Sequence, residues 1–253
     1  MKKIVALLAV ICLLFTGGIS YSQVLRMKEE AAAASQPAAV LPVSDTAVSI
    51  EQVDLDALYA LYPPEKVVGT ADGRELKWSE YFYILRSSIL SVESAMLYYA
   101  QYGFPVSWDD VYEESSGLTW RDLPALSAEQ EIREYSAIAA FAAENGIALS
   151  EEGEAAVESE LLDAAKEALG ENATLEEFEA YLAPYCLPLD VYRLMLRTDH
   201  LYRNILSELY RTPDDADEEL VEQANSAFSA DLTEVYNRTV IAWSDDFVLP
   251  QLP

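Results

Sequence analysis

Helix start and stop signals punctuate most of this sequence, and they restrict it to a mainly helical fold. Capping boxes, in which Ser or Thr precedes Glu or Gln by three residues, predict helix starts at Ser127 and Thr174. Glycine is scarce, with nine in 253 residues, and Ala, Leu and Glu are strong helix formers. The expected helices cover residues 49–61, 79–102, 127–145, 151–169, 174–182, 189–210 and 214–235.

A small β element is expected around these helices. Asp72-Gly73 lies between two short extended runs and predicts a β-hairpin over 66–77, because Gly accepts the positive φ of a tight turn. Residues 237–243 alternate and are rich in β-branched side chains, so they predict a strand. We expect this strand to pair with the hairpin, which would bring the two ends of the domain together.

The N-terminus has the pattern of an export signal. Lys2 and Lys3 precede an apolar run over 4–15, and small residues at Ser20 and Ser22 fit cleavage after Ser22. Residues 4–22 form a run of 19 residues without charge, which is also long enough for an uncleaved membrane anchor. We therefore expect an extracytoplasmic protein, either secreted or anchored to the outer face of the cytoplasmic membrane. The expected division is 1–22 signal peptide or anchor, 23–48 flexible linker, and 49–253 a single helical domain.

Charge and composition exclude several classes of function. Acidic residues number 44 against 16 basic ones, and the net charge of −28 disfavours nucleic acid as a partner. With two Cys and one His, the chain cannot build a Cys-rich or multi-His metal centre, and we expect no metal and no cofactor. An enzyme reading would need His200 or the adjacent Asp109 and Asp110 in a pocket with a perturbed pKa.

The order of the elements and the residues that join them resemble a known family. The segment AAENGIALSEE at 142–152 joins two expected helices, and Gly170, the capping box at 174–177 and a long helix to Tyr210 follow. This pattern, over about residues 66–210, resembles the peptide-binding domain of the SurA and PrsA extracytoplasmic chaperones, which is also similar to part of trigger factor. Residues 211–243 would supply the closing helix and strand.

The resemblance implies a mainly α, multi-helix peptide-binding domain with a small β-hairpin and a C-terminal strand. It also implies an extracytoplasmic chaperone or foldase-like protein that binds unfolded or newly exported polypeptides. SurA and PrsA usually carry a parvulin-type prolyl isomerase domain after this region. Only 43 residues follow Tyr210, and they contain no His or Cys. We therefore expect that isomerase domain to be absent and the chain not to be an enzyme.

Aromatic residues concentrate in one part of the chain, 78–120, which holds 11 of the 27. Trp78, Tyr81 and Phe82 have the helical spacing of a core stripe. The others offer large contact area with a polar handle, which suits tolerant capture of exposed apolar segments, although a core role for them remains open. The candidate peptide-binding residues are Tyr98, Tyr99, Tyr102, Phe104, Trp108 and Tyr112. The alternative function is a dedicated envelope adaptor with one folded partner, and the oligomeric state stays open.

Overall fold

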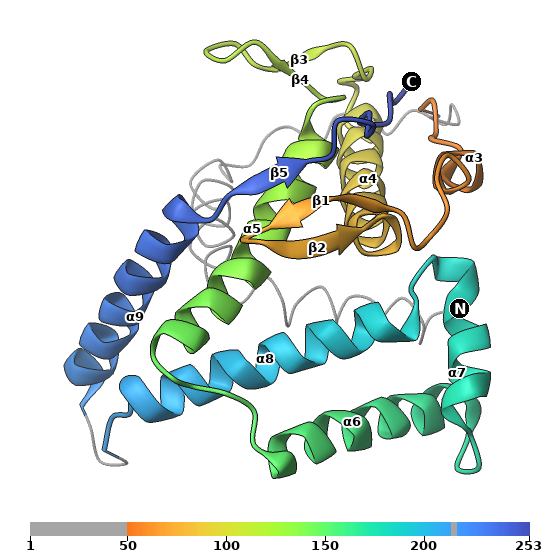
Figure 1. Ribbon diagram of the computed structural model, residues 1–253. Coiled ribbons are helices and arrows are strands. Elements are labelled where there is room, and N and C mark those ends of the chain that lie inside the picture. The colour runs from red at the N-terminus through yellow and green to blue at the C-terminus, as the bar shows by residue number, and fades with distance from the viewer. Residues whose placement is uncertain (1–49, 214–216) are drawn as a thin grey trace. The chain divides into compact units, whose positions relative to one another are not determined.

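The computed structural model describes residues 50–213 and 217–253 (Figure 1). These residues fall into two units, one made of 50–211 and 232–253, the other of 212–213 and 217–231. The second unit contains the N-terminal part of one helix. The predicted signal or anchor and the predicted linker lie outside the described residues. Among the described helices, none combines the length and the apolarity needed to cross a membrane.

The fold is mainly helical, which confirms the expected class (Figure 1). The elements in chain order are α3 (Leu55–Tyr59), β1 (Val67–Ala71), β2 (Arg74–Lys77), α4 (Trp78–Gln101), β3 (Val111–Glu113), β4 (Leu118–Thr119), α5 (Leu123–Glu144), α6 (Glu151–Leu169), α7 (Leu175–Leu182), the short 3-10 helix η1 (Ala183–Tyr185), α8 (Leu189–Leu209), α9 (Glu218–Arg238) and β5 (Ile241–Trp243).

The expected hairpin and C-terminal strand form one antiparallel sheet, in the order β2-β1-β5. Asp72 and Gly73 both have positive φ, 53° and 80°, as the tight turn requires. Gly69 lies opposite Trp243 in the register, and a Cβ at this position would come within 2.6 Å of the Ala242 carbonyl oxygen. The absence of a side chain at Gly69 therefore allows β1 and β5 to approach.

Local capping residues fix the starts of α6 and α7, and the start of α7 was predicted. The Thr174 hydroxyl accepts a hydrogen bond from the Glu177 amide at 3.2 Å, and the Glu177 carboxylate accepts one from the Thr174 amide at 2.9 Å. The Ser150 hydroxyl likewise accepts from the Gly153 amide at the start of α6. These bonds pair amides that have no partner inside the helix.

Replacing Thr174 with alanine tests this cap. We expect the free energy of unfolding to fall by about 1 kcal/mol, because the first-turn amide of α7 loses its acceptor. Urea denaturation followed by circular dichroism measures the change. Thr174→Ser keeps the hydroxyl and is expected to stay close to the parent protein. A matching loss in Thr174→Ser would contradict this role for the hydroxyl.

Three local predictions were wrong. The capping box at Ser127 does not start a helix, because α5 begins four residues earlier and has Pro124 in its first turn, where a fixed φ favours helix. The helix expected over 49–61 is reduced to α3, since the Val53 amide bonds the Glu93 carboxylate of α4 at 2.8 Å instead of a helical carbonyl. No strand was predicted within 103–126, yet this stretch contains the β3–β4 hairpin.

The centre of the core is an aromatic cluster at the start of α4. The Trp78 ring is fully buried and lies 5.2 Å from the Tyr62 ring and 6.2 Å from the Phe247 ring, between centroids. Its indole N–H donates to the Tyr59 carbonyl oxygen at 2.8 Å. This cluster joins the α3 region, α4 and the C-terminal segment, and it supports the helix whose other end carries the candidate site.

Candidate functional site

Four of the candidate aromatics gather where α4 ends. The Tyr102 amide bonds the carbonyls of Tyr98 and Tyr99 at 3.3 and 3.1 Å. Gly103 then takes a φ of 85°, and the Phe104 amide turns back to the Tyr99 carbonyl at 3.0 Å. A residue with positive φ after the last turn is a common way to end a helix and reverse the chain. The last turn of α4 and its cap therefore present Tyr98, Tyr99, Tyr102 and Phe104 together.

The β3–β4 hairpin carries the next candidate, Tyr112, and is held at its base by two buried tryptophans. The Trp120 amide donates to the Asp110 carbonyl at 3.1 Å, and the Arg121 amide to the Trp108 carbonyl at 2.9 Å. The Trp108 indole N–H reaches the carbonyl of Glu51, which precedes α3, at 2.8 Å. Both indoles are buried, so they fix the ends of the exposed hairpin to the rest of the domain.

Ring contacts connect the helix end to the hairpin. The Tyr98 ring lies 4.7 Å from the Tyr102 ring and 6.3 Å from the Tyr99 ring, between centroids. The Trp120 ring lies 5.5 Å from the Tyr99 ring and 5.0 Å from the Tyr112 ring, both nearly edge to face. Edge-to-face rings at these distances attract each other. Trp120 was not among the predicted site residues, yet its ring links the helix end to the hairpin.

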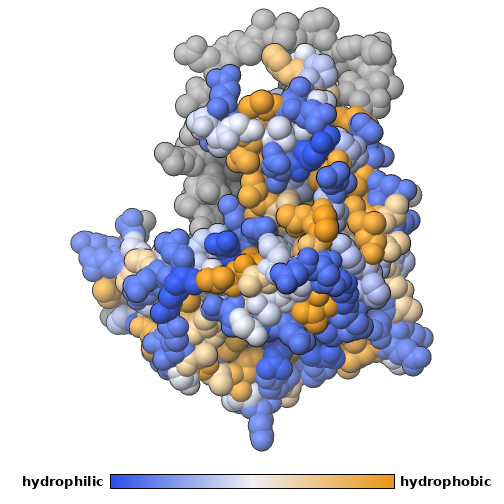
Figure 2. Space-filling model, turned by 45° about the horizontal axis from the view of Figure 1, so that its top comes forward, coloured by the Kyte–Doolittle hydropathy of each residue, from blue (hydrophilic) through white to orange (hydrophobic). Residues whose placement is uncertain are grey.

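Five of the six predicted site residues are exposed. Their exposed fractions run from 45% to 64%. Figure 2 shows the hydropathy of one face of the molecule, on which hydrophobic and hydrophilic residues are interspersed. The exposed members, here called the aromatic surface, are Tyr98, Tyr99, Tyr102, Phe104 and Tyr112. The prediction of Trp108 as an exposed peptide-binding residue was wrong. It is only 3% exposed, and its ring belongs to the interior because its N–H has found a backbone acceptor there.

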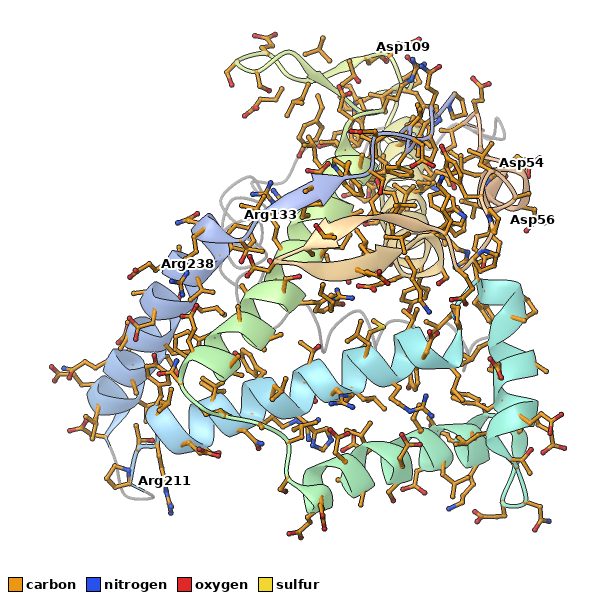
Figure 3. All side chains as sticks on the ribbon, in the orientation of Figure 1. Asp54, Asp56, Asp109, Arg133, Arg211 and Arg238 are labelled. Carbon is orange, nitrogen blue, oxygen red and sulfur yellow. The ribbon has the colours of Figure 1, made fainter. Side chains whose placement is uncertain are left out.

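The surroundings of the aromatic surface are polar and acidic. The hydrogen bond between the Tyr98 and Tyr102 side chains raises the pKa of Tyr98. Asp109, at the end of the hairpin nearest α4, pairs with Arg121 at 2.8 Å (Figure 3). The neighbouring Asp110 accepts from the Ser107 amide at 2.7 Å instead. The two adjacent carboxylates thus have separate partners and do not act as a pair.

The lone histidine lies in the contact between α6 and α8. His200 Nε2 lies 3.0 Å from Glu160 Oε1, and Arg203 Nη1 lies 3.7 Å from the same oxygen. Glu158 and Arg193 form another ion pair between these helices, at 2.5 Å. These pairs place His200 in a set of contacts that orient the two helices. Within 50–213 and 217–253, no group of three or more metal-ligating side chains comes together.

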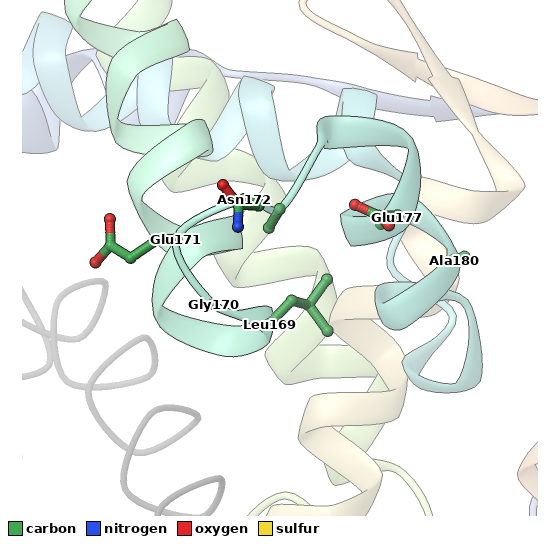
Figure 4. Close-up of a pocket in the computed structure, with 7 residues that line it drawn as sticks. Leu169, Gly170, Glu171, Asn172, Glu177 and Ala180 are labelled. Carbon is green, nitrogen blue, oxygen red and sulfur yellow. The ribbon is translucent and has the colours of Figure 1, made fainter.

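An open hollow lies at the turn between α6 and α7 (Figure 4). Its lining includes Leu169, Asn172 and Glu177. The Glu177 carboxylate accepts from the amide and the hydroxyl of Thr174, both at 2.9 Å, so it serves the helix cap. The hollow therefore follows from the way α7 begins, and the aromatic surface is the stronger candidate for a functional site.

Comparison with known proteins does not assign this chain to a family. The chain matches no family model, no curated protein and no solved structure. The resemblance to the SurA and PrsA peptide-binding domain therefore remains a prediction from the sequence pattern.

Proposed function

We propose that this protein is an extracytoplasmic chaperone-like protein that binds unfolded or newly exported polypeptides at the aromatic surface. The observation that carries the proposal is the set of exposed rings at the end of α4 and on the β3–β4 hairpin, where the buried Trp120 contacts both Tyr99 and Tyr112. Exposed large aromatics in one contiguous group are costly to leave in water, and on soluble proteins such patches mark interaction sites. The export-signal pattern at the N-terminus supports the location.

The chemistry of the rings suits clients of varied sequence. Tyr and Phe rings present flat apolar faces with few rotatable bonds, so little entropy is lost when they pack against a client. The tyrosine hydroxyls also give or accept hydrogen bonds from an unfolded backbone. Burial of a single large apolar side chain contributes about 1.5–3 kcal/mol, so several together offset the ordering of the bound segment. No covalent step and no cofactor are needed for such binding.

The experiment compares suppression of aggregation by the full chain and by two variants. Light scattering follows a chemically denatured client diluted into buffer. The site variant carries Tyr98→Ser, Tyr102→Ser and Phe104→Ser, which are the three most exposed rings. We expect the parent to suppress aggregation near stoichiometric amounts, and the site variant to need about tenfold more protein, since a few exposed aromatics dominate such contacts.

The matched control removes the same number of exposed apolar side chains elsewhere. Leu169→Ser, Leu209→Ser and Val248→Ser act at positions that are 44%, 44% and 68% exposed. We expect this control to behave like the parent. Equal weakening of both variants, or no suppression of several different clients by the parent, would contradict the proposal. The second result would favour the adaptor with a single folded partner.

A further inference from the structure

The segment that forms the aromatic surface contains no basic side chain. Between Arg86 and Arg121, residues 87–120 include neither Lys nor Arg, while they carry five acidic residues. Four of the five flank the rings at or beside the β3–β4 hairpin, namely Asp109, Asp110, Glu113 and Glu114. All four are exposed. The rings are therefore surrounded by negative charge that their own segment does not neutralise.

The nearest cation, Arg121, is already occupied. Its guanidinium pairs with Asp109 at 2.8 Å, and its Nε donates to the Pro253 carbonyl oxygen at 2.8 Å. Among the described residues, no Lys, Arg or His forms an ion pair with the other three acids of the hairpin. These acids, here called the three open carboxylates, are Asp110, Glu113 and Glu114.

Two of the open carboxylates are held in place by local hydrogen bonds. Asp110 Oδ2 accepts from the Ser107 amide at 2.7 Å, and Glu113 Oε2 accepts from the Ser116 hydroxyl at 2.5 Å. Both residues are exposed, and the second oxygen of each carboxylate has no hydrogen-bond partner among the described residues. A carboxylate that is oriented but not paired with a cation favours a cation supplied from outside.

Aromatic rings attract the same kind of group. The face of a tyrosine ring carries negative charge density, and a Lys or Arg head group within about 6 Å of the ring centroid is attracted to it. Tyr112 lies between Val111 and Glu113 in β3, and its ring contacts Trp120, which contacts Tyr99. Exposed rings and carboxylates without an ion-pair partner thus belong to the same segment of the chain, 98–114. A segment in which cations alternate with apolar side chains matches both features.

We propose that the aromatic surface and the three open carboxylates together select client segments in which Lys or Arg alternates with aromatic or aliphatic residues. This inference rests on the proposed function and names the chemistry of the segment that is bound. The attraction is electrostatic and close to solvent, so it weakens as salt shortens the screening length from about 14 Å at 50 mM to about 4 Å at 500 mM. Each exposed contact is weak, and several acting together give about a tenfold preference.

The test uses three fluorescein-labelled peptides of equal length with the same Phe, Leu and Ala residues. Their remaining positions carry Lys, Gln or Glu. Fluorescence anisotropy with the full chain measures each dissociation constant at low and high NaCl. We expect the Lys peptide to bind about tenfold more tightly than the Gln peptide at low salt, and the Glu peptide to bind most weakly. High salt is expected to remove most of these differences while leaving the Gln peptide bound.

Two variants with the same change in net charge locate the effect. Asp110→Asn, Glu113→Gln and Glu114→Gln neutralise the open carboxylates and keep hydrogen-bond acceptors. Glu151→Gln, Glu152→Gln and Glu171→Gln neutralise three exposed acids in and after α6. The hairpin variant is expected to lose the Lys preference and to bind the Gln peptide as the parent does. The α6 variant is expected to keep the preference.

The outcomes separate the two proposals. Equal binding of all three peptides, or equal loss of the preference in both variants, would overturn the inference and leave polypeptide binding standing. If no peptide binds and the parent also fails to suppress aggregation, the proposed function itself fails. Circular dichroism spectra of both variants verify that they remain folded.

Discussion

Replacing Trp78 with alanine is expected to lower the free energy of unfolding by about 3–5 kcal/mol, the usual cost of removing a large aromatic from a packed core. The ring is fully buried and contacts the rings of Tyr62, Phe82 and Phe247, which come from three separate parts of the chain. Alanine would leave a cavity where these parts meet. Urea denaturation followed by tyrosine fluorescence and far-UV circular dichroism measures the loss.

Trp78→Phe separates packing from hydrogen bonding. Phenylalanine keeps most of the ring contacts but cannot donate to the Tyr59 carbonyl oxygen, which the indole N–H reaches at 2.8 Å. We expect a loss of about 1–2 kcal/mol, the cost of one unpaired buried acceptor and a small void. Equal losses in the two variants would show that the hydrogen bond dominates, and a loss below about 1 kcal/mol for Trp78→Ala would contradict this view of the core.

Sequence alone predicted those elements whose cause is local. The Asp72-Gly73 turn and the Thr174 capping box each involve residues within three positions of one another, and both appear as expected. The pairing of the C-terminal strand with the hairpin was also predicted, although β5 is shorter than expected because α9 continues to Arg238. Here the reason was elimination, since no other segment offered a strand for the hairpin.

Three elements were not predicted correctly, and the reason differs among them. The segment before α3 is not helical because its amide at Val53 bonds Glu93, forty residues away. Ser127 and Gln130 have a capping-box spacing, but Pro124 allows α5 to begin earlier, and the box then falls inside the helix. The β3–β4 hairpin is held by the buried Trp120 rather than by strand propensity, so its short strands gave no sequence signal.

The candidate site also contains residues that the sequence predicted correctly and residues that it did not. Four of the predicted contact residues share one helix end, and a helical spacing with a Gly stop was enough to bring them together. Trp108 was assigned wrongly, because its indole bonds the carbonyl of Glu51, 57 residues earlier in the chain. Trp120 was missed for the converse reason. It lies beneath the exposed rings and joins them, and only the paired hairpin places it there.

The half-buried Glu134 is expected to make stability depend on pH in an unusual direction. Removal from water, together with the charge of Glu131 one turn away on α5, raises the pKa of Glu134 to about 7. Burial also raises the pKa of Glu131, whose carboxylate accepts a hydrogen bond from the Tyr135 hydroxyl at 2.6 Å. A carboxyl with a raised pKa binds its proton more tightly in the folded chain than in the unfolded chain. Folding is therefore favoured at low pH by this group.

The sign and the pH range of this effect follow from the pKa of Glu134 in the unfolded chain and in the folded chain. Below about pH 4.5, near the ordinary value for Glu, the group is protonated in both states and costs nothing. As the pH rises from there to about 7, the unfolded chain loses the proton first, so the free energy of unfolding falls, by up to about 3 kcal/mol. Above that range the folded chain carries the buried charge and the cost is constant.

Glu134→Gln removes this charge and keeps the shape of the side chain. We expect it to raise the free energy of unfolding by about 1–3 kcal/mol at pH 8 and to change it little at pH 4, as measured by urea denaturation at both pH values. Neutralising Glu134 also relieves its repulsion of Glu131, which adds to the gain at high pH. Glu234→Gln, on the exposed side of α9, is the control and is expected to change stability little at either pH, because that carboxylate is already in water. A gain of the same size at pH 4 and pH 8 in Glu134→Gln would show that improved packing, and not the removal of a buried charge, is responsible.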